Sequence, residues 1–272
     1  MKRERKPLRP GKGKWLNLIY GILRLSVFLV LIAQFFNRDY ESVFLCILTL
    51  FLFLVPSILE RRLRVVVPDT LEIIILLFIY AAEILGEIRA YYIQFPYWDT
   101  MLHTLNGFLC AAIGFSLVDL LNRSTKISTF SLSPVYMAVV AFCFSMTVGV
   151  MWEFFECAMD RFFLLDMQKD AIMNTISSVM LDPAGGNTPV IIQDIADVII
   201  VHSDGTQQAL GLGGYLDVGI WDTMKDLFVN FIGATVFSII GYFYVKQRGK
   251  GKLASSFIPR RREDLLPTKD RR

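Results

Sequence analysis

Two copies of one tetrapeptide carry the residues of this 272-residue chain that are best suited to chemistry. The sequence Trp-Asp-Thr-Met supplies Asp99 in its first copy and Asp222 in its second. A further metal-ligating residue follows each aspartate by four positions, His103 in one case and Asp226 in the other. Because residues four apart share one face of a helix, each copy predicts a pair of side chains that act together. Asn230 continues the second face by one more turn.

Four further carboxylates lie towards the ends of two other apolar stretches. They are Glu83, Glu87, Glu153 and Glu156. Carboxylates at such a density repel one another unless protons or a cation intervene. One imidazole with several carboxylates and an amide suits zinc, manganese, iron or magnesium, whereas copper(I) and iron–sulfur clusters prefer thiolates. A divalent metal of this class is therefore the cofactor that we expect.

The residue types also indicate roles. We expect the metal ligands to be Asp99, His103, Glu153 and Asp226. Glu156 or Asp222 would act as a general base on metal-activated water and Asn230 would orient a ligand, while Glu83 and Glu87 extend the polar face. The alternative interpretation gives the same groups structural roles, with the aspartates as helix N-caps and with His103 and Asn230 as interhelical hydrogen-bonding groups.

The composition indicates which elements must position these residues. Hydrophobic residues make up 54% of the chain, charged residues only 19%, and the mean hydropathy is +0.49; soluble domains carry about 25% charged residues. Stretches of roughly 20 apolar residues cross a hydrocarbon core of about 30 Å. Six such stretches are present, at residues 15–36, 42–59, 70–92, 100–121, 134–156 and 223–245. We therefore expect an all-α integral membrane protein, a bundle of six transmembrane helices.

The distribution of basic residues predicts the orientation. Lys and Arg are retained on the cytoplasmic side of a membrane, and 22 of the 28 lie in the two ends of the chain and in two short connections, residues 60–69 and 122–132. This pattern predicts that both termini are cytoplasmic. It also places all of the candidate site residues on the outer side of the membrane.

Five parts are expected along the chain. They are a basic cytoplasmic N-terminus (1–14), the first five transmembrane helices (15–156), an extracytoplasmic insert (157–221), the sixth helix (222–246) and a basic, disordered cytoplasmic tail (247–272). Within the insert, a short helix is expected around residues 168–180. A β-hairpin is expected around the Asp204-Gly205 turn, because β-branched residues precede this dipeptide.

Three segments carry a resemblance to a known family. They are Tyr-Trp-Asp-Thr-Met-Leu-His at residues 97–103, Trp-Glu-Phe-Phe-Glu at residues 152–156, and the stretch from Gly214 to Ala234 that contains the second tetrapeptide. With these segments the chain resembles the YjdF-like family of bacterial inner-membrane proteins over about residues 60–245. The resemblance implies a membrane bundle with a polar face but no particular reaction. An acid and a histidine opening one helix, a glutamate closing another, and the Asp-x-x-x-Asn-x-x-Gly pattern are also similar to the VanZ-like family of glycopeptide-resistance membrane proteins.

Three functions fit these observations. The first is a metal-dependent hydrolase or transferase that acts on a lipid or cell-envelope substrate from the outer leaflet. The second is a non-catalytic membrane sensor or partner protein, and the third is a cation- or proton-coupled transporter, which needs a polar path to the cytoplasmic side. The lipid bilayer is an expected partner and nucleic acid is not, while the oligomeric state is not predicted.

Overall fold

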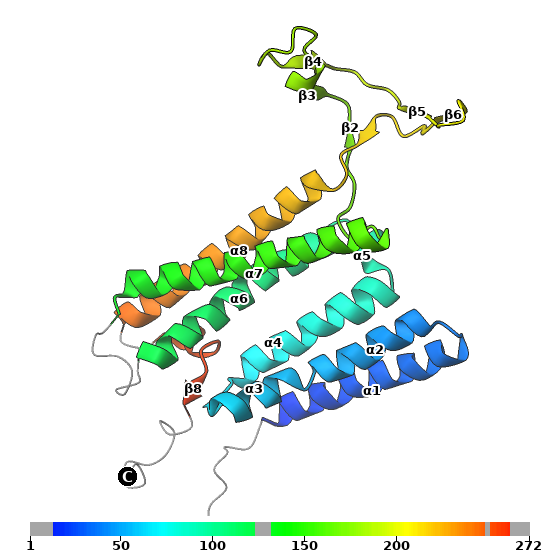
Figure 1. Cartoon of the computed structure of the whole chain (residues 1–272). Helices are drawn as coiled ribbons and strands as arrows, with labels where there is room; N and C mark the ends of the chain where they lie inside the picture. Colours follow the sequence, from blue (N-terminus) through cyan, green and yellow to red (C-terminus); the bar gives the residue numbers. More distant parts are fainter. Residues whose placement is uncertain (1–12, 123–131, 248–250, 262–272) are drawn as a thin grey trace, which may run out of the picture. The chain divides into compact units, whose positions relative to one another are not determined.

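The chain is organised as two compact units. A computed structural model describes residues 13–122, 132–247 and 251–261 (Figure 1). One unit comprises residues 1–149 together with 228–272, and the other comprises residues 150–227.

Helices make up almost all of the first unit. In chain order they are α1 (Lys14–Phe36), α2 (Tyr40–Leu52), α3 (Val55–Leu63), α4 (Asp69–Tyr80), the π-helix η1 (Ala81–Ile88), α5 (Tyr91–Gln94), α6 (Trp98–Asn122), the first half of α7 (Pro134–Phe163), most of α8 (Ile220–Lys246) and α9 (Lys252–Ser255). Both α7 and α8 run on as continuous helices into the second unit.

Five helical stretches among the described residues are long and apolar enough to cross a membrane. They are Lys14–Phe36, Tyr40–Arg62, Trp98–Asn122, Pro134–Phe163 and Ile220–Lys246. The stretch expected as the third span, residues 70–92, is divided mainly between the 12-residue α4 and the 8-residue η1. At 1.5 Å per residue, α4 alone is about 18 Å long and falls short of a hydrocarbon core of about 30 Å. Five helices thus meet the expectation of a membrane protein, and a sixth crossing remains a prediction.

The hairpin of α1 and α2 packs beside α4 (Figure 1). Asp39 starts α2, because its carboxylate accepts hydrogen bonds from the backbone N–H of Ser42 at 3.1 Å and from the Ser42 hydroxyl at 2.6 Å. Val27 of α1, Cys46 of α2 and Leu76 of α4 are all fully buried in one apolar cluster. This packing explains why a chain segment with few polar residues forms a defined hairpin instead of separate spans.

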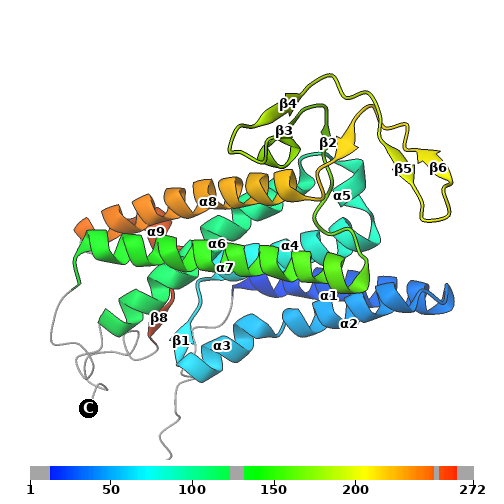
Figure 2. The same cartoon turned by 45° about the horizontal axis from the view of Figure 1, so that its top comes forward.

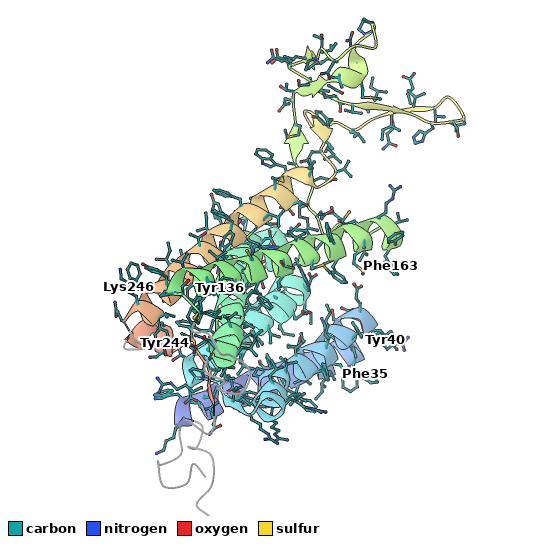
Figure 3. The ribbon with its side chains drawn as sticks, turned by 60° about the vertical axis from the view of Figure 1, so that its left-hand side comes forward. Phe35, Tyr40, Tyr136, Phe163, Tyr244 and Lys246 are labelled. Carbon is teal, nitrogen blue, oxygen red and sulfur yellow. The ribbon has the colours of Figure 1, made fainter. Side chains whose placement is uncertain are left out.

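Residues near the ends of α1 and α8 mark the two ends of the first unit. Phe35 and Tyr40, at the turn between α1 and α2, lie far from Tyr244 and Lys246, near the end of α8 (Figure 3). The ends of α1 and α8 therefore lie at opposite ends of this unit (Figure 3), and its orientation in a membrane remains a prediction.

A second apolar cluster joins α4, α6, α7 and α8. Ala111 and Phe115 of α6, Ala141 of α7 and Phe237 of α8 have no exposed surface. Small residues allow transmembrane helices to approach closely, and Gly233 shows this directly: a Cβ placed there would lie 2.0 Å from the backbone oxygen of Thr104. Close packing of α8 against α6 therefore depends on the absence of a side chain at position 233.

The segment after α8 differs from its prediction. Residues 247–272 are expected to be disordered, yet α9 and the strand β8 (Arg260–Arg261) form within them, and β8 pairs with β1 (Val65–Val66). Phe257 and Ile258 are buried in the second apolar cluster, where Phe257 packs against Phe108 with ring centroids 5.1 Å apart. The expectation of a wholly disordered tail is therefore wrong for residues 251–261, because apolar side chains within the basic segment have a core to enter.

The second unit holds the ends of α7 and α8 and an insert built from short β-ribbons (Figure 2). Its strands are β2 (Ile172–Met173), β3 (Ile176–Ser178), β4 (Val190–Ile192), β5 (Ile199–Val201), β6 (Gln207–Ala209) and β7 (Tyr215–Leu216), with a 3-10 turn η2 (Val179–Leu181). The pairs β2–β7, β3–β4 and β5–β6 are all antiparallel. Since α7 extends to Phe163 and α8 begins at Ile220, the insert is shorter at both ends than the expected 157–221.

The hairpin prediction is confirmed and the helix prediction is wrong. β5 and β6 pair across the turn in which Gly205 adopts φ +84°, and the Asp204 carboxylate accepts a hydrogen bond from the backbone N–H of Thr206 at 2.9 Å. Residues 168–180 form β2, β3 and the start of η2 instead of a helix. Their partners lie in β7 and β4, so this segment takes its form from strands that are distant in sequence.

Candidate functional site

The start of α6 pairs an aspartate with a histidine. Asp99 lies in the first turn, and its Oδ1 is 3.4 Å from Nε2 of His103. His103 is 9% exposed. Two ligands of one tetrahedral zinc ion, each about 2.0–2.2 Å from it, are separated by roughly 3.4 Å. The pair is therefore spaced as two ligands of a single ion would be.

The π-helix η1 precedes α6 in the chain and is separated from it by the short helix α5. Its wide turn is seen in the hydrogen bond from the N–H of Arg89 to the carbonyl of Ile84, and the indole N–H of Trp98 reaches the carbonyl of Ala81 at 3.3 Å. Such helices occur often at functional sites. Glu83 is half-buried and Glu87 is exposed, so the structure separates the environments of these two predicted members of the polar face.

One turn further along α6, the helices α6, α7 and α8 pack around the side chain of Asn230. The amide of Asn106 donates to Oδ1 of Asn230 at 3.3 Å, and the amide of Asn230 lies 3.6 Å from the sulfur of Met146 on α7. Asn230 is 1% exposed. Glycines provide its space: a Cβ at Gly107 would lie 2.1 Å from the Asn230 backbone oxygen, and one at Gly149 would lie 2.7 Å from its amide nitrogen. We call this set, Asn106, Gly107, Met146, Gly149 and Asn230, the asparagine layer.

Three of the predicted carboxylates are buried, and all three belong to residues of the second unit. Glu153 is 4% exposed, Glu156 is 8% exposed and Asp226 is 1% exposed. The indole N–H of Trp152 donates to Oε1 of Glu156 at 2.8 Å, and Nζ of Lys225 lies 3.6 Å from Oδ1 of Asp226. Carboxylates are almost never buried unless they are paired or coordinated.

The carboxylate of Asp222 has a hydrogen-bond partner for each of its oxygens. Its Oδ2 accepts the backbone N–H of Lys169 at 2.9 Å, and its Oδ1 accepts from Nζ of Lys225 at 2.7 Å. The first bond joins the insert to the first turn of α8, whereas the second lies within α8. The general-base role expected for Asp222 remains a prediction.

Asp217, which was not predicted from the sequence, supports the start of α8. Its carboxylate accepts the backbone N–H groups of Ala171 and Trp221, each at 2.8 Å. Burial raises the pKa of Asp217, but the hydrogen bonds from Ala171, Trp221 and Gly219 outweigh it and hold that pKa below its ordinary value. The local signal is an aspartate followed by a glycine with φ +78°, just before an apolar helix; the bond to Ala171 cannot be foreseen because 46 residues separate the two positions.

Comparisons with known proteins identify one family. The model for a family described as "Predicted membrane protein (DUF2238)" matches residues 19–247. This match includes the three segments on which the YjdF-like resemblance rests, and YjdF-like proteins are this family. It gives no support to a relationship with VanZ-like proteins. Neither the curated proteins nor the solved structures contain a match. The match covers most of the chain, which therefore belongs to the DUF2238 family of predicted membrane proteins.

Proposed function

We propose that this protein is a metal-dependent hydrolase or transferase of the bacterial inner membrane, acting on a lipid or cell-envelope substrate from the outer leaflet. In this proposal α4 and η1 together make a sixth crossing, since their combined 20 residues would span about 30 Å at the α-helical rise. Both termini are cytoplasmic and the insert is extracytoplasmic, as the basic residues indicate.

The asparagine layer is the observation that carries the proposal. His103 precedes Gly107 by four residues on α6, Asp226 precedes Asn230 by four on α8, and Glu153 follows Gly149 by four on α7. Four residues of helix advance about 6 Å and return to the same face. Since α6 and α8 run opposite to α7, each of these steps leads away from the layer in the same direction. Each of the three helices that contribute to the layer therefore carries a metal-ligating residue four positions from its residue in the layer.

Together with Asp99, these side chains form a ligand set for one divalent cation. Imidazole and carboxylate are the ligands of zinc in hydrolytic sites, and manganese, iron and magnesium accept similar sets. The bound metal would supply a Lewis acid and an activated water. Glu156, placed three residues after Glu153, would act as the general base. Asn230 holds the three helices in register and would orient the ligand.

A cation or proton transporter is less consistent with the first unit. Transport requires a polar path between the two sides of the membrane. Asp119 is buried near the far end of α6, but Phe115 and Phe237 are fully buried with ring centroids 6.1 Å apart, and Phe108 packs on Phe237 at 5.0 Å. This aromatic packing occupies the interior between the asparagine layer and Asp119.

A sensor or partner protein is a second candidate, favoured by the surface of the insert. All three residues of β5 are exposed, with Ile199 at 59% and Val201 at 63%. An isolated two-stranded ribbon with apolar faces is only marginally stable in water. Deletion of residues 188–210 tests this candidate. If the protein then loses its function in cells while its metal content is unchanged, a binding role is favoured over catalysis.

Metal analysis of two histidine variants tests the proposed function. Protein purified in nanodiscs is loaded with zinc, manganese, iron or magnesium, washed and analysed by inductively coupled plasma mass spectrometry. His103→Ala should lose the metal that the unaltered protein retains. His202→Ala is the matched control, because His202 is exposed in the insert and should leave the metal content unchanged. Equal metal content in both variants would remove the proposed centre.

A further inference from the structure

We infer that an apolar groove between α6 and α8 holds the hydrocarbon chain of a lipid substrate whose polar end lies at Asp99 and His103. The inference rests on the proposed function for the identity of the polar end. The groove belongs entirely to the first unit and encloses about 520 Å³. Its lining includes Thr100, Met101, Thr104, Phe108, Gly233 and Val236.

The groove has a fixed wall. Gly233 brings the backbone of α8 against Thr104 and Phe108, since a Cβ there would lie 2.0 Å from the Thr104 oxygen and 2.8 Å from the Phe108 nitrogen. The ring of Phe108 is held in turn by Phe237 and Phe257, with centroids 5.0 and 5.1 Å away. A groove built from backbone contact and interlocked rings is largely formed before a ligand arrives, as small-molecule sites usually are.

The length of the groove suits one leaflet. Its lining runs along α6 from Tyr97 to Phe108, which corresponds to about 16 Å of helix. Half of a hydrocarbon core of about 30 Å is close to this length. A chain that lies in the groove would therefore extend from the outer end of α6 to about the middle of the bilayer.

The surroundings decide in favour of hydrocarbon as the occupant. No charged side chain lines the groove among the residues that the structure describes, and the Thr104 hydroxyl donates to the carbonyl of Thr100 within its own helix at 2.7 Å. Met101 and Val236 are 45% and 46% exposed on helices that are long and apolar enough to cross the membrane. The apolar lining is thus continuous with the surface that contacts lipid.

The polar end of the ligand follows from the neighbouring residues. Asp99 immediately precedes Thr100, and His103 immediately precedes Thr104. The groove and the aspartate–histidine pair are therefore formed by residues in the same two turns of α6. The substrate class is a lipid with a single chain in the groove and a polar, hydrolysable or transferable headgroup at the metal centre.

A second groove provides a matched control. It encloses about 270 Å³ between α7 and α8 and is lined by Val135, Val139, Phe142, Ser238 and Tyr242, among others. These residues lie near the start of α7 and the later half of α8. Along α7 and α8, these residues lie beyond the asparagine layer from the proposed metal ligands Glu153 and Asp226.

Photo-crosslinking measures occupancy directly. The full chain is reconstituted in nanodiscs of phosphatidylethanolamine and phosphatidylglycerol that contain a trace of phospholipid with a diazirine in its acyl chain. Crosslinked residues are identified by mass spectrometry. Labelling should concentrate on Met101, Ile232 and Val236, and Val236→Trp should abolish it by filling the groove. Val139→Trp, in the second groove, should leave this labelling unchanged.

The outcomes separate this inference from the proposed function. Even labelling of all lipid-facing helices, unchanged in Val236→Trp, would show annular lipid only and would overturn the groove. Efficient disulfide dimers of Val236→Cys would assign the groove to a second copy of the chain and would also overturn it. Metal retained in His103→Ala together with specific groove labelling would leave a lipid site without the proposed metal centre. Metal lost in His103→Ala with even labelling would leave the metal centre without the groove.

Discussion

The same tetrapeptide opens α6 and α8 but is used differently in the two helices. In α6, Asp99 faces His103 on its own helix at 3.4 Å. In α8, Asp222 accepts the backbone N–H of Lys169 and the ammonium group of Lys225. The difference arises from the residue three positions after the aspartate, which is Leu102 in one helix and Lys225 in the other, and from the insert that reaches back to the second copy.

The tryptophans of the two copies also have different surroundings, and the threonine of the second copy contacts the insert. Trp98 donates to the carbonyl of Ala81 at the start of the π-helix, whereas Trp221 is 62% exposed. Thr223 is hydrogen-bonded to the side chain of Gln168 in the insert. A repeated motif therefore indicates a repeated helix start, and its chemistry is decided by what packs against each copy. At the first copy both Asp99 and His103 belong to the candidate centre, whereas at the second Asp226 belongs to it and Asp222 contacts the insert.

The largest expected effect comes from an amide substitution made in each copy. Asp99→Asn should weaken metal binding by at least about 10- to 100-fold, the loss seen when a residue that hydrogen-bonds to a metal ligand is altered. Asp222→Asn should leave metal affinity unchanged, because Asp222 serves the insert. Competition with a fluorescent chelator measures both. Equal weakening by the two variants would mean that the copies are equivalent and would break the comparison.

The local stability of the insert should respond in the opposite order, with a larger effect at Asp222 than at Asp99. Asp222→Ala removes the acceptor of the Lys169 N–H and the partner of Lys225, at a cost of about 1–2 kcal/mol, because most of the carboxylate is buried and the lysine is not. The result should be faster hydrogen exchange at the Lys169 amide and faster proteolysis in the insert. Asp99→Ala is the control and should leave both rates unchanged.

A smaller effect is expected at the tryptophans. Trp98→Phe loses the hydrogen bond to the Ala81 carbonyl, which contributes about 0.5–1.5 kcal/mol. Hydrogen exchange in residues 81–88 should then accelerate. Trp221→Phe should leave exchange at the start of α8 as it is, since most of the Trp221 side chain is exposed. If Trp221→Phe accelerated hydrogen exchange and Trp98→Phe did not, the tryptophan of the second copy, and not that of the first, would be the one whose hydrogen bond matters.

The smallest effect is a pH dependence at the base of the insert. The pKa of Asp217 is lowered, so its stabilising contribution is complete above the ordinary value of 3.8 and is lost as the pH falls through the lowered value. The pKa of Asp170 is raised by burial and by the nearby Asp166 and Asp217. Its contribution is complete below 3.8 and is lost as the pH rises through the raised value.

Hydrogen exchange of the Ala171 and Trp221 amides as a function of pH checks both signs. Asp217→Asn should flatten the loss of protection on the acid side. Asp170→Asn should abolish the loss of protection that accompanies rising pH and should slightly increase protection at neutral pH. Unaltered profiles in both variants would show that these carboxylates do not control the support of the second copy.

Features that depend on local composition and spacing could be predicted before any coordinates were available. One such feature is the set of long apolar helices α1, α6, α7 and α8. A helix that crosses a bilayer needs about 20 mostly apolar residues, and runs of this length can be read from the sequence. The Asp204-Gly205 turn follows from the backbone freedom of glycine. The i, i+4 spacing that pairs Asp99 with His103 needs nothing beyond the geometry of one helix.

Contacts between residues that are far apart in the chain could not be predicted in this way, because they depend on how the segments fold against one another. The burial of Phe257, the strands in place of a helix at residues 168–180, and the use of Asp222 by Lys169 all depend on segments dozens of residues apart. Hydropathy and periodicity describe what each segment can form, whereas a contact requires two segments to be folded against each other. The asparagine layer is the clearest case, because Asn106 and Asn230 are 124 residues apart and their contact depends on two glycines that leave room for it.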